Sequence, residues 1–484
     1  MGKNSGLKQS VMSGLAWAFA ERLCAQGVSF IVSIVLARIL LPEEYGIIAV
    51  VTIFITIANV FVSNGFGEAL VQKKDSDEID FSTVFFCSLL FSAILYSVLF
   101  ICASFIADFY STPQLKIVIR VLALKIPISA VSTIQHAYVS KKMIFKKFFF
   151  STLGGTVFSG ILGVIMAIAG CGVWALVAQY LSNTLIDTIV LFITVPWRPK
   201  LIFSSSSAKK LIGYSWKITA ASLINTLFNE LRGIVIGKVY SPADLAYYNR
   251  GNQFPSLVIT NINASISKVV FPALTKVADN RERLKAVSRR GMKITAFVIF
   301  PLMIGLMVEA ETVVKLLLTE KWIECVPFLQ CHCLYYMCQP IQTANWEIIK
   351  ASGRSDLCLK LEIIKKPLGV IVILATMKYG VMAIAIGNAV FAGVSMIINI
   401  IPNKKLVGYK FTEQMKDILP ALSLCAVMGA TLLMLHRFLS VGMLIQLVID
   451  VIVGIIIYCG GAKVIKLDTF DYIIDAARSI LRKR

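Results

Sequence analysis

Apolar residues gather into long runs along the whole chain, and short polar segments separate these runs. Most runs hold about 20 predominantly apolar residues, the length that an α-helix needs to cross a bilayer. No polar segment between them is long enough to form a soluble domain. The pattern predicts an all-α integral membrane protein with about 14 transmembrane helices, at residues 11–38, 44–66, 82–108, 114–140, 149–169, 171–195, 211–238, 243–271, 286–309, 323–350, 357–377, 380–401, 416–436 and 440–464.

The composition also indicates a membrane protein. Of the 484 residues, 57% are hydrophobic and 15% are charged, whereas about a quarter of the residues of a soluble domain are charged. A soluble enzyme, a secreted disulfide scaffold and a disordered chain are therefore excluded.

The positive charge of the chain follows the predicted topology. The formal net charge is +21. If the N-terminus lies inside, 32 Lys and Arg fall in the inside segments and 7 in the outside segments. Lys and Arg accumulate in the cytoplasmic loops of membrane proteins, so this bias predicts that both termini are cytoplasmic. Because the topology explains the positive charge, we predict no nucleic-acid partner.

A short internal repeat indicates how the helices are grouped. An apolar run, a cation and a Pro-acid turn occur as IVLARILLPEE at residues 34–44 and as IVIGKVYSPAD at residues 234–244. Six predicted helices separate the copies, so both lie on the same side of the membrane. Duplicated halves are typical of transporters. We predict an N-terminal six-helix bundle at 1–200, a C-terminal six-helix bundle at 201–405, two additional transmembrane helices at 406–466, and an amphipathic cytoplasmic tail at 467–484.

The predicted tail has helical spacing of its apolar residues. Phe470, Ile473, Ile474, Ala477 and Leu481 recur at the interval that places them on one helical face. This indicates an amphipathic helix on the cytoplasmic leaflet. A frayed basic tail is the other interpretation.

Polar residues form faces on several predicted membrane helices. The face at 243–271 runs the length of its helix and includes Asn252, Gln253 and Asn263. Gln26 belongs to a similar face on the first helix, and Asn225 and Asn229 to one on the seventh. Such faces turn toward a wet cavity or a bundle interior. They predict a shared aqueous cavity that binds a polar substrate, although Ser, Thr and Asn also join helices in ordinary bundles.

Cations several residues inside the predicted spans suggest the charge of the substrate. We single out Arg22, Lys125, Lys217 and Arg232. A cavity with surplus positive charge favours an anion, and the arginine fork suits phosphate. In the other interpretation, neighbouring glutamates neutralise the arginines and Lys217 reaches the interface.

The cysteines do not indicate a metal site. Cys325, Cys331, Cys333 and Cys338 surround His332, but on a helix Cys331 and Cys333 point about 200° apart. The run lacks paired CxxC or HxxxH spacing, so we predict no metal ligands, no catalytic residues and no cofactor.

Three segments resemble a known family. VLARILLPEEYG at 35–46 is similar to the first outer turn of bacterial polysaccharide flippases, and NGFGEALVQKK at 64–74 with STVFF at 82–86 is similar to their next segment. SPADLAYYNRG at 241–251 resembles their repeat motif. The chain thus resembles the Wzx-type branch of the multidrug/oligosaccharidyl-lipid/polysaccharide (MOP) exporter superfamily over most of its length.

This resemblance implies two bundles in a V shape and transfer of an undecaprenyl-pyrophosphate-linked oligosaccharide to the outer leaflet by alternating access. It implies cavity cations for the pyrophosphate, a role that only Arg22 fits by its position in the first helix. We expect location in the bacterial inner membrane, with membrane lipids and other polysaccharide-assembly proteins as candidate partners. Coupling to H⁺ or Na⁺ is left open, and Glu21 and Glu347 are the candidates for proton coupling.

Two other functions compete with the flippase. An ion-coupled multidrug antiporter of the related MATE type would need an anionic cavity, but the polar faces here carry cations. A membrane polysaccharide polymerase or ligase would need a sizeable outer loop with catalytic side chains. The outer segments here are short and poor in paired carboxylates or His. We therefore predict a transporter rather than an enzyme.

Overall fold

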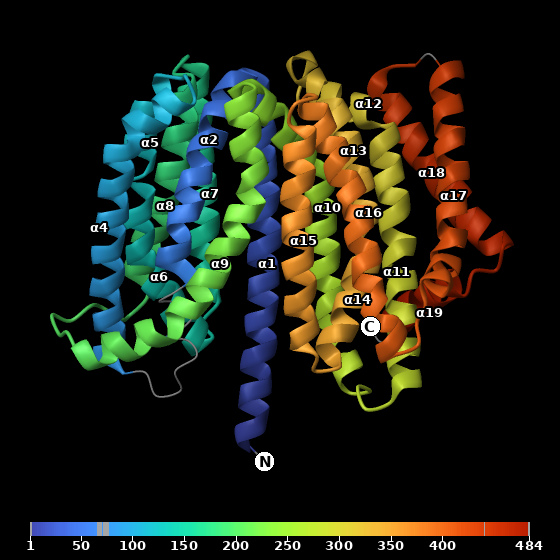
Figure 1. Ribbon diagram of the computed structural model, residues 1–484, viewed down its shortest axis with the longest axis horizontal. Coiled ribbons are helices and arrows are strands. Elements are labelled where there is room, and N and C mark those ends of the chain that lie inside the picture. Colours follow the sequence, from blue (N-terminus) through green and yellow to red (C-terminus); the bar gives the residue numbers. More distant parts are fainter. Residues whose placement is uncertain (1, 65–69, 71–76, 440, 483–484) are drawn as a thin grey trace. The chain divides into compact units, whose positions relative to one another are not determined.

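The computed structural model describes residues 2–64, 70, 77–439 and 441–482. These residues are helical almost throughout. By its internal contacts the chain divides into two compact units, Met1–Ala246 (unit 1) and Tyr247–Arg484 (unit 2). Within each unit the long helices run side by side (Figure 1).

Unit 1 is built from the first helices of the chain. They are α1 (Gly2–Ile39), α2 (Pro42–Asn59), the short π-helix η1 (Val60–Asn64), α4 (Glu78–Phe109), α5 (Gln114–Leu122), α6 (Lys125–Lys142), α7 (Lys146–Ile168), α8 (Val173–Thr194) and α9 (Ser205–Val239). The helix α9 packs against α2, η1 and α4. It therefore belongs with unit 1 by contact, although it opens the second half of the repeat. The predicted domain boundaries come from the sequence repeat and stay a prediction.

Unit 2 holds most of α10 (Pro242–Thr275), which begins in unit 1, and the helices that follow. They are α11 (Arg281–Val308), α12 (Ala310–Leu317), the 3₁₀-helix η2 (Glu320–Cys325), α13 (Val326–Met337), α14 (Gln339–Ala351), α15 (Ser355–Thr376), α16 (Val381–Leu406), α17 (Phe411–Phe438), α18 (Met443–Val464) and α19 (Asp468–Arg482).

Helices occupy the described part of every predicted span, so the all-helical membrane fold is confirmed. Ten segments within the described residues are long and apolar enough to cross a membrane. The other predicted spans correspond to α9, α10, the pair α13–α14 and α15. Polar faces lower the hydropathy of α9 and α10, and a break at Cys338, just before Pro340, divides α13 from α14. The number of fourteen crossings stays a prediction.

Small residues let the helices of unit 1 approach closely. A Cβ atom added at Gly160 of α7 would lie 2.4 Å from Cγ2 of Val32 on α1. On the opposite face, a Cβ atom at Gly155 would lie 3.0 Å from the Asn183 carbonyl oxygen of α8. Glycines at membrane-helix interfaces allow this close packing in the absence of a hydrophobic driving force. The helix α7 is thereby held between α1 and α8.

The two copies of the repeat start their helices in the same way. The backbone N–H of Leu41 donates to Oε2 of Glu44 at 2.8 Å, before α2. The backbone N–H of Ser241 donates to Oδ2 of Asp244 at 3.1 Å, before α10. In each copy the acid at the third helical position thus satisfies the N-cap donor, while proline occupies the first position. The Pro-acid turn of the repeat is therefore a helix-capping device.

The predicted amphipathic tail forms the helix α19 (Asp468–Arg482). The helix α19 packs against α11: the rings of Phe470 and Phe297 lie 6.2 Å apart, and the Arg290 guanidinium lies 4.4 Å from the centre of the Tyr472 ring. These contacts support the helical interpretation over a frayed tail. Its location on the cytoplasmic leaflet stays a prediction.

Candidate transport site

The predicted site residues divide between the two units. Unit 1 holds Glu21, Arg22, Gln26, Lys125, Lys217, Asn225, Asn229 and Arg232, and unit 2 holds Asn252, Gln253, Asn263 and Glu347.

On α1, Glu21, Arg22 and Gln26 are all half-buried. Among the described carboxylates of unit 1, none forms a salt bridge with Arg22. Binding of an anion by Arg22 and its neutralisation by Glu21 both stay predictions. A half-buried guanidinium without an acid beside it retains its capacity to bind an anion.

Lys125 is the first residue of α6 and faces an aromatic ring. Its side chain is half-buried, and Nζ lies 5.4 Å from the centre of the Tyr180 ring of α8. A cation–π contact steadies an ammonium group without neutralising it. About three turns further along α6, His136 Nε2 lies 3.1 Å from Asp187 Oδ2, so that histidine already has a carboxylate partner.

The predicted residues of α9 differ in exposure. Lys217, Asn225 and Asn229 are exposed on unit 1, and Arg232 is half-buried. An exposed ammonium on a long side chain is consistent with the interface position considered for Lys217. Arg232 and Arg22 are therefore the two predicted arginines of unit 1 that are partly withdrawn from its surface.

On α10, two of the predicted polar residues have protein partners. The hydroxyl of Tyr336 donates to Oδ1 of Asn252 at 3.1 Å, which joins α13 to α10. Gln253 accepts a hydrogen bond from Arg250 one turn earlier. The bond to Asn252 joins two helices, as polar residues do in ordinary bundles, whereas the bond to Gln253 lies within α10.

The structure brings Asn263 and Glu347 together. Both line a cavity of about 20 Å³ between α10, α11 and α14, which is roughly enough for one water molecule. Glu347 is buried, and Lys350 Nζ lies 3.4 Å from its Oε1. Oδ1 of Asn263 is buried without a hydrogen-bond partner among the described residues. A buried carboxylate beside a cavity large enough for a water molecule is an arrangement found in proton-binding groups of membrane proteins.

Sequence reasoning missed a buried polar network in unit 2. Nδ2 of Asn345 donates to Oε1 of Gln414 at 2.8 Å, and Nδ2 of Asn403 donates to Oδ1 of Asn345 at 2.8 Å. Next to it, Arg289 binds both carboxylate oxygens of Asp417. The position of Asp417 inside a predicted span was the available signal, because an intramembrane acid requires a partner.

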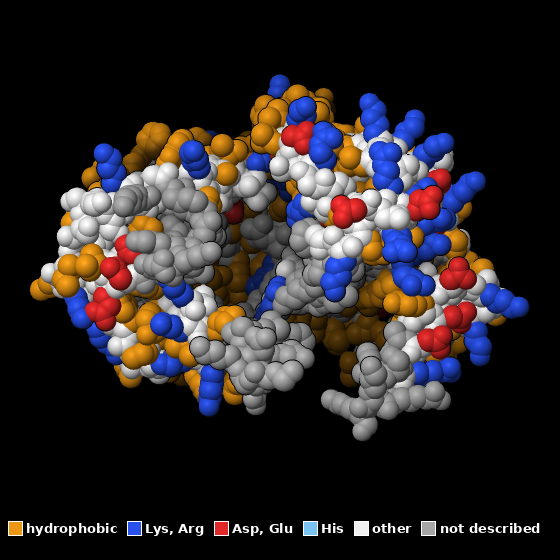
Figure 2. Space-filling model, turned by 90° about the horizontal axis from the view of Figure 1, so that it is seen from below, with side chains coloured by type: hydrophobic (Ala, Val, Ile, Leu, Met, Phe, Trp, Pro, Cys, Tyr) orange, Lys and Arg blue, Asp and Glu red, His pale blue; other side chains and the backbone are white. Residues whose placement is uncertain are grey.

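The same end of unit 2 carries many cations. Figure 2, which looks at the molecule from below, shows Lys and Arg gathered over the lower ends of the unit 2 helices. Some of these cations form hydrogen bonds with backbone carbonyl groups. Arg281 donates to the carbonyl oxygens of Lys405 and Leu406, both at 2.7 Å. Lys285 donates to the carbonyl oxygen of Gly408 at 3.0 Å. These bonds satisfy carbonyl groups at and after the C-terminus of α16. The dense basic stretch of α11 therefore has a structural role besides its expected effect on topology.

A comparison with known proteins identifies the family. Residues 35–327, more than half of the chain, match the family described as "Polysaccharide biosynthesis protein". The chain belongs to this family. It is 24% identical over 366 residues to "Lipopolysaccharide biosynthesis protein WzxC" of Escherichia coli (strain K12), covering 74% of this chain and 73% of that protein. It is 22% identical to "Succinoglycan biosynthesis transport protein ExoT" of Rhizobium meliloti (strain 1021), covering 66% and 65%.

A solved structure shows the same fold. The structure titled "Lipid II flippase MurJ, inward closed conformation" matches with a TM-score of 0.75 at 15% identity, and the match covers 94% of this chain and 99% of that one. The resemblance to Wzx-type flippases predicted from the sequence is therefore confirmed, and the polysaccharide biosynthesis protein described here is a multi-pass helical membrane protein.

Proposed function

We propose that the protein moves an oligosaccharide linked to undecaprenyl pyrophosphate from the cytoplasmic to the outer leaflet of the bacterial inner membrane. The family match over residues 35–327 carries this proposal. The printed names of the relatives, for lipopolysaccharide biosynthesis and succinoglycan transport, support a polysaccharide precursor as substrate. The likeness to a lipid II flippase supports a fold suited to lipid-linked substrates.

In this proposal the polar head group enters a cavity while the lipid tail stays in the bilayer. Arg22 binds the pyrophosphate through its two-pronged guanidinium, with Lys125 and Arg232 as further cations. Polar side chains such as Asn225 and Asn229 hydrogen-bond the sugars. Alternating access then releases the head group outside. The protein makes and breaks no covalent bond, and both of its termini lie in the cytoplasm.

Flipping in liposomes tests the function and the site together. Protein reconstituted with a fluorescent undecaprenyl-pyrophosphate oligosaccharide should expose the label to an outside quencher. Arg22→Ala should slow this by about tenfold or more, because one charge-assisted hydrogen bond contributes roughly 1.5–3 kcal/mol. Lys378→Ala, which removes an exposed cation between α15 and α16, should flip at the wild-type rate.

The outcomes separate the two parts of the proposal. Normal flipping by a folded Arg22→Ala variant would remove Arg22 from the site and leave the function standing. Failure of the wild-type protein, with a suitable sugar and imposed H⁺ and Na⁺ gradients, would contradict the function itself.

Proton coupling through Glu347 is a separate expectation. Because its carboxyl group lines the small cavity beside Asn263, we propose that it takes up and releases the coupling proton. Glu347→Gln cannot exchange a proton, so stimulation of flipping by an imposed pH gradient should disappear. Glu311→Gln, which alters an exposed acid on α12, should keep the stimulation. Equal stimulation in both variants, or stimulation by a Na⁺ gradient alone, would argue against this role.

A further inference from the structure

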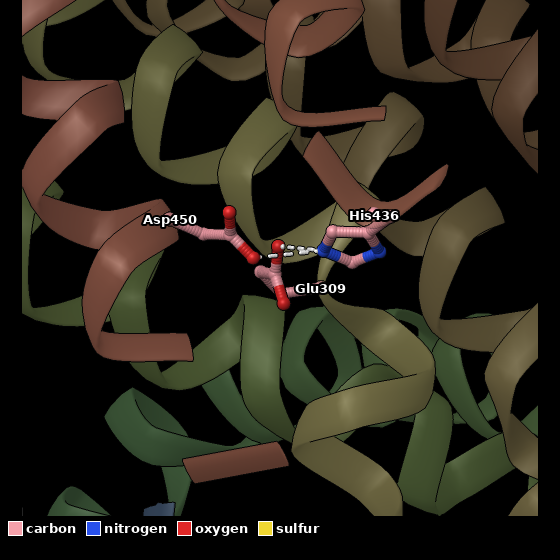
Figure 3. Close-up of side chains that lie close together, drawn as sticks. All are labelled: Glu309, His436 and Asp450. Atoms are coloured by element: carbon pink, nitrogen blue, oxygen red, sulfur yellow. Dashed lines mark hydrogen bonds and ion pairs between the residues drawn. The ribbon is translucent and has the colours of Figure 1, made fainter. Parts of the chain in front are cut away.

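Three ionisable side chains, drawn in Figure 3, meet just after the C-terminal end of α11, whose N-terminal end carries the basic stretch. Glu309 occupies the junction of α11 and α12, His436 the last turn of α17, and Asp450 the second turn of α18. His436 Nε2 lies 2.8 Å from Glu309 Oε1 and 2.9 Å from Asp450 Oδ2. One ligand atom from each residue lies within 4.8 Å of the other two. In Figure 3 both carboxyl groups turn toward the same ring nitrogen.

The two acids are withdrawn from solvent. The side chain of Asp450 is 0% exposed and that of Glu309 is 6% exposed, whereas that of His436 is 28% exposed. Buried carboxylates are costly unless their charge is balanced. A protonated imidazole supplies one positive charge for two negative ones. Even with a protonated histidine, the cluster keeps one negative charge that no side chain within it balances.

Oxygen atoms without hydrogen-bond donors around the cluster also indicate a missing positive charge. Oε2 of Glu309, Oδ1 of Asp450 and Oε1 of Gln446 are all buried without a hydrogen-bond partner among the described residues. Gln446 is itself 8% exposed, and its Nε2 donates to Oδ2 of Asp450 at 2.9 Å, which places its amide group at the cluster. Buried acceptors without donors require an explanation, such as a bound cation. The single Nε2 proton of the imidazole cannot satisfy them.

We propose that Glu309, His436 and Asp450 form a binding site for a divalent transition-metal ion of the zinc class. A neutral imidazole with two carboxylates carries a charge of −2, which a divalent cation balances. Imidazole nitrogen and carboxylate oxygen are ordinary zinc ligands, and Ca²⁺ or Mg²⁺ would require more oxygen atoms than this site offers. The Gln446 amide oxygen or a water molecule is available as a fourth ligand.

The geometry requires only a small adjustment to hold the ion. Ligands of a tetrahedral zinc ion are about 3.4 Å apart, from metal–ligand distances near 2.1 Å. The present separations of 2.8 and 2.9 Å must open by about half an ångström, which side-chain rotation can supply. Partial exposure of His436 offers an entry path. A bound ion would join α17 and α18 to the junction of α11 and α12, independently of the transported substrate.

Zinc binding to the full-length protein in detergent tests the proposal. After chelator treatment and dialysis, we expect saturable uptake of one Zn²⁺ per chain and a rise in the thermal unfolding temperature. Asp450→Asn and His436→Asn should each weaken the affinity at least tenfold. His136→Asn removes the other histidine that pairs with an acid in the described residues, and it should bind zinc like the wild type.

A second measurement does not depend on the folding of variants. Co²⁺ bound to the wild-type protein should give the visible absorption of a site with nitrogen and oxygen ligands. Intense thiolate charge-transfer bands would instead locate the ion at the cysteines around His332 and overturn the proposal. Absence of stoichiometric uptake, or an unfolding temperature that responds to pH and not to zinc, would overturn it as well.

Discussion

Replacing Gly46 by alanine is expected to prevent stable folding of unit 1. A Cβ atom at this position of α2 would lie 1.9 Å from the carbonyl oxygen of Pro242, at the start of α10. Backbone atoms cannot turn aside as a flexible side chain can, so one helix must shift. Gly46 is buried, and the cost of the strain should be about 3 kcal/mol or more. The expected results are a low yield of monodisperse protein and a strongly lowered unfolding temperature in detergent.

Gly154→Ala is the matched control for this substitution. Gly154 lies on the exposed side of α7, and a Cβ atom there would meet nothing within 4 Å. Alanine also has the higher helix propensity, so this variant should unfold at or above the wild-type temperature. A Gly46→Ala protein with wild-type stability would show that the starts of α2 and α10 do not approach as closely as described.

Replacing Asp417 by alanine is expected to cause the second large loss of stability. Its side chain is 3% exposed and accepts both hydrogen bonds of the Arg289 guanidinium, while Lys293 Nζ lies 3.3 Å away. The buried hydroxyl of Tyr409 also donates to Asp417, at 2.7 Å. Without the acid, two cations face each other and the hydroxyl loses its acceptor. The loss should be about 3–5 kcal/mol.

Tyr409 makes this network insensitive to moderate pH changes. It lies in the turn between α16 and α17, where burial, and then the hydrogen bond to Asp417, raise the pKa of the hydroxyl well above its ordinary value. The hydroxyl therefore remains a donor throughout the physiological range. Its bond to Asp417 should persist wherever the carboxylate is charged.

An exposed pair of the same type provides the control. Arg354 binds both oxygens of Asp356 at 2.8 Å, but both side chains are largely in solvent. Since exposed ion pairs contribute little, Asp356→Ala should leave the unfolding temperature almost unchanged. Equal effects of Asp417→Ala and Asp356→Ala, measured by thermal unfolding or by titration with a denaturing detergent, would show that burial does not decide the strength of the Arg289–Asp417 pair.

The polar faces show where prediction from the sequence succeeds and where it stops. Helical spacing predicted the shared face of Asn252, Gln253 and Asn263, since spacing along a helix is local. It could not predict that Tyr336 donates a hydrogen bond to Asn252, or that Asn263 and Glu347 line the same cavity. In both pairs the two residues lie on different helices, and Asn252 and Tyr336 are 84 residues apart in the sequence.

The sequence by itself determined the class of protein, the positions of its helices and its family. Each of these depends on local properties: hydropathy over about 20 residues, cap residues within one turn, and short motifs such as SPADLAYYNRG. Only the tertiary structure decided which polar groups meet inside it. Arg289 pairs with Asp417 across 128 positions, and Glu309 meets His436 across 127. Such contacts depend on how helices pack, because a buried charge is stable only beside the partner that packing supplies.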